Sequence, residues 1–307
     1  MAKSNSLPDH VLRVCTYTEL RQYALAFADA CLNLLLLFGA AGLGKSRCLR
    51  EAVGEQVSWI DGNGTPFGIY MEAYKHRDQP LVLDDVDGLH RDHRGVRLLK
   101  TLCQSEPSKR LCWMTAAAEL EKRGIPRQFD TTSRVAIIAN RWETLNADVA
   151  ALQDRGHVLH FEPSAGEVHR HCAEWFWNQE IFDFVGRHLH LMASPSLRTY
   201  GLAWELMHAG LPWRPSVLSR CLTGPALEVA KLKADPSFEA EEARVRAFVE
   251  AGHGCRATYF NHARKLQPPA DIPAIKLLHT KPPEPAPQSP LDLLTLLRQR
   301  HGDLGAG

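Results

Sequence analysis

Short apolar runs alternate with amphipathic stretches through the first half of this chain. The apolar runs are typical of strands buried on both faces, and the stretches between them carry apolar residues at helical spacing. Core strands are expected at 34–38, 56–61, 80–85, 134–139 and 157–161, an additional strand at 110–115, and helices at 16–31, 45–53, 67–76 and 94–104. This order predicts an α/β fold in which helices flank a five-stranded parallel sheet.

The pattern changes after the last of these strands, and only helical periodicity remains. Ser164 and Glu167 have the spacing of a capping box, which marks the start of the first helix of this part. A proline-rich stretch begins after Gln267, and Ser289 starts a short amphipathic helix. We therefore expect an α/β domain at 1–163, an all-α lid at 164–232, a helical hairpin at 233–267, and a linker with a short C-terminal helix at 268–307.

Composition excludes some classes of function and leaves others open. Lys and Arg total 36 against 35 Asp and Glu, so any nucleic-acid contact must come from a local patch rather than from net charge. The eight cysteines include no C-x-x-C pair, which favours reduced thiols over a disulfide framework. The N-terminus lacks an apolar signal segment, and no apolar run is long enough to span a bilayer. We expect a cytoplasmic protein without a membrane partner.

The sequence G-x-x-x-x-G-K-S at 39–46 directly follows the first apolar run. Glycines at such a turn let backbone N–H groups converge on an anion, and the helix that starts near Lys45 adds the positive end of its dipole. Lys45 is then expected to contact the β- and γ-phosphates, and the Ser46 hydroxyl to ligate Mg²⁺. The expected nucleotide contacts are Gly39, Ala40, Ala41, Gly42, Leu43, Gly44, Lys45, Ser46 and Arg47. The alternative is a glycine-rich turn that binds no ligand.

Two adjacent acids end the apolar run at 80–85. Asp84 is expected in the Mg²⁺ shell, and Asp85 as the general base that polarises an attacking water. Because Asp is shorter than Glu, Asp85 must approach that water closely or act through a second one. Adjacent acids at a strand end are, on their own, also common as helix caps or loop residues.

Two further polar residues lie at strand ends later in the chain. Asn140 follows the run at 134–139, where its amide can orient a water or the γ-phosphate, and Arg155 comes just before the last strand. With these residues in place, the chain from about residue 16 to residue 212 resembles the AAA+ family of P-loop NTPases. The resemblance consists of a Walker A loop, a Walker B strand, a sensor-1 asparagine (Asn140), an arginine-finger position (Arg155) and a helical lid.

The resemblance implies a homo-oligomer, a ring or a filament, that uses ATP and Mg²⁺. Arg155 of one subunit would reach the γ-phosphate bound by the next, and its alternative role is to pair with a helix C-terminus. Arg198, in the first turn of a lid helix capped by Ser194 and followed by Pro195, matches the sensor-2 arginine, which contacts the nucleotide in cis. Its alternative role is that of a solvated arginine. The Asp-Asp pair departs from the commoner Asp-Glu pattern, which bears on hydrolysis rather than on binding.

A second motif lies near the C-terminus, where two short helices are predicted at 241–251 and 255–266. Together they resemble a helix-turn-helix, and the sequence Arg-Ala-Thr-Tyr-Phe at 256–260 resembles the recognition helix of resolvase-type DNA-binding modules. Such a helix enters the major groove with its early residues at base edges. The residues expected to contact DNA are Arg256, Thr258, Tyr259, Asn261, Arg264 and Lys265. The alternative is a basic hairpin that packs on the lid.

These features predict a DNA-associated AAA+ ATPase of the kind that regulates transposition, initiates replication or loads a helicase. The alternative is a protein-remodelling or regulatory switch that binds partners through its C-terminal helix and does not bind DNA. A small-molecule kinase is disfavoured because no acceptor-pocket motif accompanies the glycine-rich loop.

Overall fold

The computed structural model describes residues 7–8, 10–62, 64–86, 93–114, 118–141, 154–192 and 196–267. The chain divides into two compact units, Met1–Pro163 and Ser164–Gly307. The linker and the short helix predicted at 268–307 lie outside the described residues. None of the helices within the described ranges combines the length and apolar character that a membrane crossing requires.

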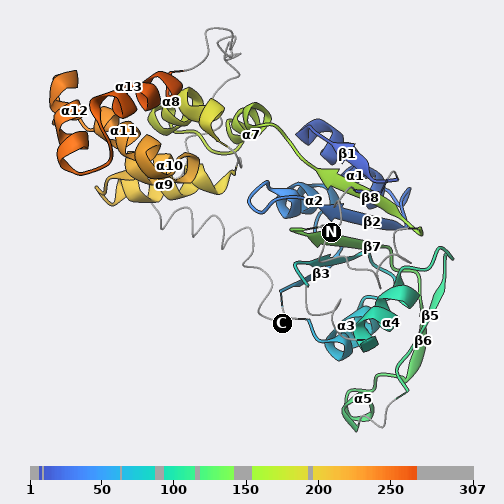
Figure 1. Ribbon diagram of the computed structural model, residues 1–307. Helices are drawn as coiled ribbons and strands as arrows, with labels where there is room; N and C mark the ends of the chain where they lie inside the picture. The colour runs from blue at the N-terminus through green and yellow to red at the C-terminus, as the bar shows by residue number, and fades with distance from the viewer. Residues whose placement is uncertain are drawn as a thin grey trace, which may run out of the picture. The chain divides into compact units, whose positions relative to one another are not determined.

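The first unit is built on a parallel sheet of six strands in the order β1-β8-β2-β7-β4-β3 (Figure 1). The strands are β1 (Leu12–Val14), β2 (Leu34–Phe38), β3 (Ser58–Asp61), β4 (Leu81–Asp84), β7 (Val135–Ala139) and β8 (His157–Phe161). The predicted α/β class with a parallel sheet is confirmed, but the predicted number of five strands is wrong. The additional strand is β1, which pairs with β8 in the register Leu12 to Leu159. Its first two residues are exposed, so it has no apolar run.

The three central strands are buried along their whole length, which explains their continuous apolar sequences. Four helices accompany them: α1 (Tyr17–Ala28), α2 (Lys45–Val53), α3 (Pro66–Lys75) and α4 (His93–Leu102). Residues of α3 and α4 form one core with Leu36, Leu83 and Ile137 on one face of the sheet. The alternate residues, such as Leu37 and Ile138, are equally buried on the opposite face. Both faces of the sheet are therefore covered.

Local signals explain where α1 and α2 begin and end. The Thr16 hydroxyl accepts a hydrogen bond from the Glu19 backbone N–H, and the Glu19 carboxylate accepts one from the Thr16 backbone N–H. The predicted capping box of α1 is therefore confirmed. The second helix starts at Lys45 after Gly44, whose φ of 76° suits glycine, and it ends at Gly54 with a φ of 66°. The predicted sequence of strand, glycine-rich turn and helix is therefore present.

A two-stranded antiparallel hairpin is inserted between α4 and β7. It consists of β5 (Lys109–Cys112), the short helix α5 (Ala118–Lys122) and β6 (Gln128–Thr131). The sequence predicted a strand near β5 but neither α5 nor β6. Tyr70 of α3 fixes the hairpin, because its hydroxyl donates to the Pro126 carbonyl at 2.8 Å and its ring packs on Phe129. The buried Lys109 side chain also donates to the Ser133 carbonyl at 2.7 Å.

The second unit is helical throughout its described residues, as predicted. It contains α7 (Ala165–Cys172), α8 (Gln179–His188), a 3₁₀ turn (Leu189–Leu191), α9 (Arg198–His208), α10 (Trp213–Cys221), α11 (Gly224–Ala234), α12 (Glu241–Glu250) and α13 (Arg256–Lys265). The Ser164 hydroxyl caps α7 by accepting from the Glu167 backbone N–H at 3.1 Å. The two helices predicted for the C-terminal motif correspond to α12 and α13.

The helices α11, α12 and α13 share a small core of their own. Its buried members are Val229, Val245, Phe248, Tyr259 and Ala263, which come from all three helices. A pair of short helices buries little apolar area, and α11 supplies the missing face. The predicted hairpin of α12 and α13 therefore packs on α11, most of which lies in the segment predicted as the lid, as the alternative to DNA binding expects, and the three helices form a three-helix unit.

Candidate nucleotide-binding site

The order of the central strands brings the predicted site residues of the first unit together. β7 lies between β2 and β4, so the carboxyl ends of these three strands are neighbours. The glycine-rich loop leaves β2, Asp84 ends β4 and Asn140 follows β7. This edge of the sheet is where open α/β sheets bind ligands.

The shape of the loop depends on its glycines. A Cβ atom on Gly39 would lie 2.3 Å from the carbonyl oxygen of Phe161 in β8, so no larger residue fits there. Gly42 has a φ of 81°, in the left-handed region. Tyr17 of α1 also fixes the loop, because its buried hydroxyl donates to the Leu43 carbonyl at 2.8 Å. The loop is thus fixed by close backbone approach on one side and by a tyrosine on the other.

Lys45 lies against the loop that precedes it. Its side chain is 5% exposed, and Nζ donates to the carbonyl oxygens of Gly39 at 2.8 Å and Ala40 at 3.0 Å. A third bond, of 3.2 Å, goes to the Asn140 side-chain oxygen. The lysine is therefore inside the loop, where a bound phosphate would compete with these neutral acceptors and make the stronger, charge-assisted bond.

Ser46 and Asp84 meet beside that lysine. The Asp84 carboxyl is buried and takes a side-chain hydrogen bond from Ser46. Burial raises the pKa of Asp84 above its ordinary value; the Ser46 bond opposes this shift, and the charges of Asp61 and Asp85 add to it. A hydroxyl and a carboxylate are oxygen ligands of the kind Mg²⁺ takes alongside phosphate, and a cation would favour the charged form of Asp84. These two residues therefore fit the expected Mg²⁺ site.

Asn140 links the lysine to the second acid of the pair. Its Nδ2 donates to Asp85 Oδ1 at 2.7 Å, while its Oδ1 accepts from Lys45. Asp85 has a φ of 52°, in the left-handed region that Asp tolerates better than most residues. The exposed Asp85 carboxylate therefore points toward β7, where the amide fixes its orientation.

Within the first unit, the structure does not bring the predicted arginine Arg155 into this cluster. In its own chain, Arg155 donates from Nη1 to the Lys100 carbonyl at 2.5 Å, near the C-terminal end of α4. Arg198 belongs to the other unit, where it is exposed at the start of α9 and its backbone N–H donates to the Ser196 hydroxyl. The predicted caps of that helix, Ser194 and Pro195, lie outside the described residues.

Two residues near the site were not identified from the sequence. Asp61 ends β3 directly opposite Asp84 in the register of the sheet, and it adds negative charge beside the site. Its position at the end of an apolar strand could have indicated it. Tyr17 gave no such signal, because its contact with Leu43 joins residues that are far apart in the sequence.

The predicted DNA-contacting residues separate into an exposed and a buried group. Arg256, Asn261, Arg264 and Lys265 are exposed on α13, and Thr258 is half-buried. The prediction that Tyr259 is exposed is wrong. Its side chain is 0% exposed because it fills the core of α11, α12 and α13, and its hydroxyl donates to Glu241 Oε1 at 3.1 Å. Burial and this carboxylate raise the pKa of Tyr259 to about 12.

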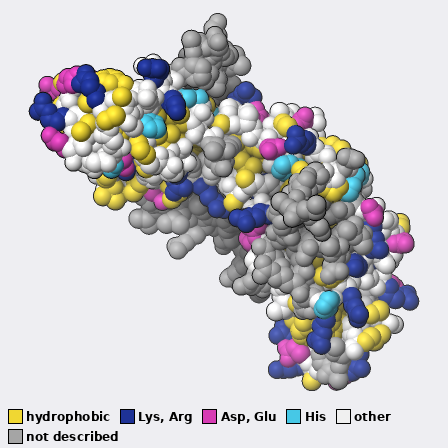
Figure 2. All heavy atoms as spheres, viewed as in Figure 1, with side chains coloured by type: hydrophobic (Ala, Val, Ile, Leu, Met, Phe, Trp, Pro, Cys, Tyr) yellow, Lys and Arg dark blue, Asp and Glu magenta, His cyan; other side chains and the backbone are white. Residues whose placement is uncertain are grey.

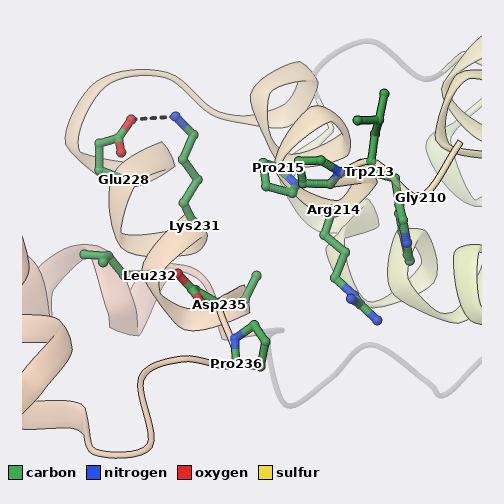
Figure 3. A pocket seen from close by; sticks show the side chains of 12 residues that line it. Gly210, Trp213, Arg214, Pro215, Glu228, Lys231, Leu232, Asp235 and Pro236 are labelled. Atoms are coloured by element: carbon green, nitrogen blue, oxygen red, sulfur yellow. Dashed lines mark hydrogen bonds and ion pairs between the residues drawn. The ribbon is translucent and has the colours of Figure 1, made fainter. Parts of the chain in front are cut away.

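The helical unit also contains an open cleft of ≈ 600 Å³, between the turn that precedes α10 and the end of α11 (Figure 3). Trp213, Arg214 and Pro215 line one side of it. On the other side Lys231 is paired with Glu228 at 2.8 Å, as the dashed line in Figure 3 marks. All of its lining residues come from the helical unit, and none of them belongs to the predicted phosphate-binding set.

No protein-family model matches the chain. Over 134 residues it is 29% identical to the "uncharacterized 36.7 kDa protein in nrdC-mobD intergenic region" of Enterobacteria phage T4. The match covers 41% of this chain and 39% of the phage protein, so it spans about two fifths of that relative's length.

Among solved structures, the chain is similar to NtrX from Brucella abortus, crystallised in complex with ATP. The match has a TM-score of 0.37 and 12% sequence identity, and it covers 87% of this chain and 69% of NtrX. At that TM-score the likeness has no bearing on function.

Proposed function

We propose that this chain binds ATP with Mg²⁺ at the loop 39–46 and hydrolyses it as an oligomeric AAA+ type ATPase that acts on or at DNA. The observation that carries the nucleotide part is the contact between Ser46 and Asp84 beside Lys45. A hydroxyl, a lysine and a strand-end carboxylate are the three groups that this chemistry requires; the start of α2 supplies the first two and the end of β4 supplies the third.

Each residue then has a distinct task. Lys45 would exchange the loop carbonyls for the β- and γ-phosphates, and Ser46 and Asp84 would hold the metal ion. Mg²⁺, when bound, supplies positive charge to phosphate oxygens. Asp85 would accept a proton from the attacking water, with its carboxylate oriented by the Asn140 amide at 2.7 Å. Arg155 would act on the nucleotide of a neighbouring subunit, and Arg198 on the nucleotide of its own.

Binding and turnover are tested separately. A fluorescent ATP analogue titrated with and without Mg²⁺ measures affinity, and inorganic phosphate release without an added acceptor measures hydrolysis. We expect binding that Mg²⁺ strengthens and phosphate release that needs no acceptor. Phosphate transfer that occurs only with an added small molecule would assign the site to a kinase instead.

The DNA part rests on the three-helix unit of α11, α12 and α13. Its last helix presents Arg256, Asn261, Arg264 and Lys265 on an exposed face, as a helix that enters the major groove requires. The test is DNA binding by the full chain at several salt concentrations, with and without ATP. Affinity that falls steeply with salt would support phosphate contacts.

A second candidate is a protein-remodelling switch that does not bind DNA, and the charge distribution favours it. Basic and acidic side chains are mixed on the face of α12 and α13 drawn in Figure 2, and no uniformly basic patch covers it. Cations on these helices are paired with acids, including Arg244 with Glu241 at 3.0 Å. Absence of DNA binding even at low salt, together with intact ATP turnover, would select this candidate.

A further inference from the structure

Glu242 on α12 forms an ion pair with Arg256, the first residue of α13. Glu242 accepts two hydrogen bonds from the Arg256 guanidinium, at 2.5 Å from Nη1 and 2.6 Å from Nη2. This is the paired, planar geometry in which arginine binds carboxylates and phosphates most strongly. Arg256 also lies 5.2 Å from the centre of the Phe260 ring, which further limits where the guanidinium can point. The side chains of the ion pair are nevertheless 59% and 64% exposed, so both are accessible to a ligand.

Arg256 belongs to the exposed face of α13, the face that would contact DNA. Four residues along one face of the helix are exposed: Arg256, Phe260, Asn261 and Arg264. Tyr259 and Ala263 instead face the core shared by the three helices. Within the described chain, Arg264 has no ion pair, so its charge is available. Arg256 is the cation of this face closest to the start of the helix, and its strongest donors are already bound.

We propose that Glu242 is an internal competitor of DNA: its carboxylate holds the Arg256 guanidinium, and a DNA phosphate or base edge must displace it before Arg256 can contact DNA. This inference rests on the proposed DNA function. The cost of opening the ion pair is the same for every DNA sequence, so Glu242 lowers the affinity for DNA without changing the difference in binding free energy between two sequences that both engage Arg256.

The competition persists throughout the neutral pH range. The bonds from Arg256 lower the pKa of Glu242, the charge of Arg246 acts in the same direction, and the nearby Glu241 opposes it. The carboxylate is therefore ionised at neutral pH, and Arg256 is always charged. Glu242 thus acts as a constant competitor rather than as a pH switch.

The sign of one substitution separates this role from a structural one. If the ion pair mainly ties α12 to α13, removing it loosens the helix and weakens DNA binding. If Glu242 competes with DNA, removing it frees Arg256 and strengthens binding. Glu250 offers a matched control, because it is an exposed acid on the same helix, and within the described chain it has no ion pair.

The experiment measures binding of the full chain to a fluorescein-labelled duplex of mixed sequence by anisotropy, over a series of KCl concentrations. We expect Glu242→Gln to lower Kd by about two- to fivefold, the size typical of an exposed ion pair. The slope of log K against log salt should steepen by about one ion, because one more cation meets phosphate. Glu250→Gln should change Kd by clearly less, since it only alters net charge. In the double variant Glu242→Gln/Arg256→Ala the gain should disappear.

The inference is overturned by an equal gain from both Gln variants, by unchanged or weaker binding of Glu242→Gln, or by a gain that survives in the double variant. Absence of DNA binding by every variant at the lowest salt is a different result. It would remove the proposed DNA function, and with it this inference, whereas DNA binding that is insensitive to Glu242 would leave the proposed function standing.

Discussion

The Asn140 side-chain amide donates a 2.7 Å hydrogen bond to the Asp85 carboxylate. The same amide accepts from Lys45 through its oxygen at 3.2 Å, so it joins the lysine of the loop to the second acid of the strand end. A phosphate that draws Lys45 away leaves the Asn140 oxygen without that donor. The amide is then in a position to respond to nucleotide while it still orients Asp85.

Asp85→Asn tests the role of this carboxylate. The substituted side chain keeps its size and can still accept from Asn140, but it cannot take a proton from water. We expect ATP affinity within about twofold of wild type and turnover lowered by roughly 10²- to 10⁴-fold, the usual contribution of a general base. Phosphate release and analogue binding, measured on one preparation, check both values. Asp78→Asn, at an exposed residue of a loop, is the control. Undiminished hydrolysis in Asp85→Asn would remove Asp85 from the base role.

Lys45→Ala tests the loop itself. Hydrogen bonds to charged groups contribute about 1.5–3 kcal/mol each, so loss of the ammonium should weaken ATP binding by at least tenfold to a hundredfold. Lys75→Ala is a matched control, because Lys75 is an exposed lysine at the end of α3. Titration of the fluorescent analogue gives both dissociation constants. ATP affinity unchanged by Lys45→Ala, with the fold intact by circular dichroism, would contradict the assignment of the loop.

Much of this site could be predicted from the sequence because its residues follow strands that are buried on both faces. Such strands read as unbroken apolar runs, and the polar residue after each run marks the sheet edge, as for Asp84 and Asn140. Their grouping at one edge depends on β7 lying between β2 and β4, which is a matter of strand order. Sequence periodicity does not specify that order.

The features that were missed have physical reasons in common. β1 has two exposed residues followed by a buried one, and β6 alternates over only four positions, so neither strand gives a clear period of two. Tyr259 was expected at the surface because α13 was considered with α12 alone. Its burial requires α11, which starts more than thirty residues earlier and contributes Val229 to the same core.

Arg155 has two possible roles that one mixing experiment separates. The 2.5 Å bond to the Lys100 carbonyl satisfies a group near the end of α4, as a helix-terminal cation does. For a residue that acts on the neighbouring subunit, Arg155→Ala should lose turnover and regain it when mixed with Asp85→Asn, because each chain supplies what the other lacks. Phosphate release in mixtures of varied ratio checks this. A loss of thermal stability in Arg155→Ala without rescue would assign Arg155 to the helix end alone.

His169 predicts how the helical unit responds to acid. It is buried, its ring stacks on Phe182 at 3.7 Å, and Nδ1 lies 2.8 Å from the Tyr200 hydroxyl. Burial lowers the pKa of His169 from 6.5 to about 4. Between these values the unfolded chain binds a proton that the folded chain does not, so stability is full above pH 6.5 and falls as the pH drops toward 4. The loss approaches about 3 kcal/mol at most.

Hydrogen exchange of the α7 and α8 amides in the full chain measures this effect. The exchange rate at each pH is corrected for the intrinsic rate at that pH. His169→Gln should flatten the dependence between pH 6.5 and 4, whereas His253→Gln, at an exposed residue, should leave it in place. A steep fall in protection that persists in His169→Gln would assign the acid response to other groups.

Tyr259 and Arg264 lie on opposite sides of α13, and their substitutions should separate stability from DNA binding. Tyr259→Ala removes a fully buried ring from the core of the three-helix unit, so we expect a loss of roughly 3–5 kcal/mol in stability there. Tyr259→Phe loses only the 3.1 Å bond to Glu241, and should cost about 1 kcal/mol. Hydrogen exchange of the α11 and α13 amides measures both.

DNA binding by the same proteins gives the complementary result. Because the Tyr259 hydroxyl faces Glu241 inside the unit, Tyr259→Phe should leave the Kd for a mixed-sequence duplex within about twofold of wild type. Arg264→Ala should weaken binding to all sequences alike and lower the salt slope by about one, as expected for a phosphate contact. A loss of affinity in Tyr259→Phe without loss of hydrogen-exchange protection would mean that the phenol reaches DNA, and that the three-helix core opens when DNA binds.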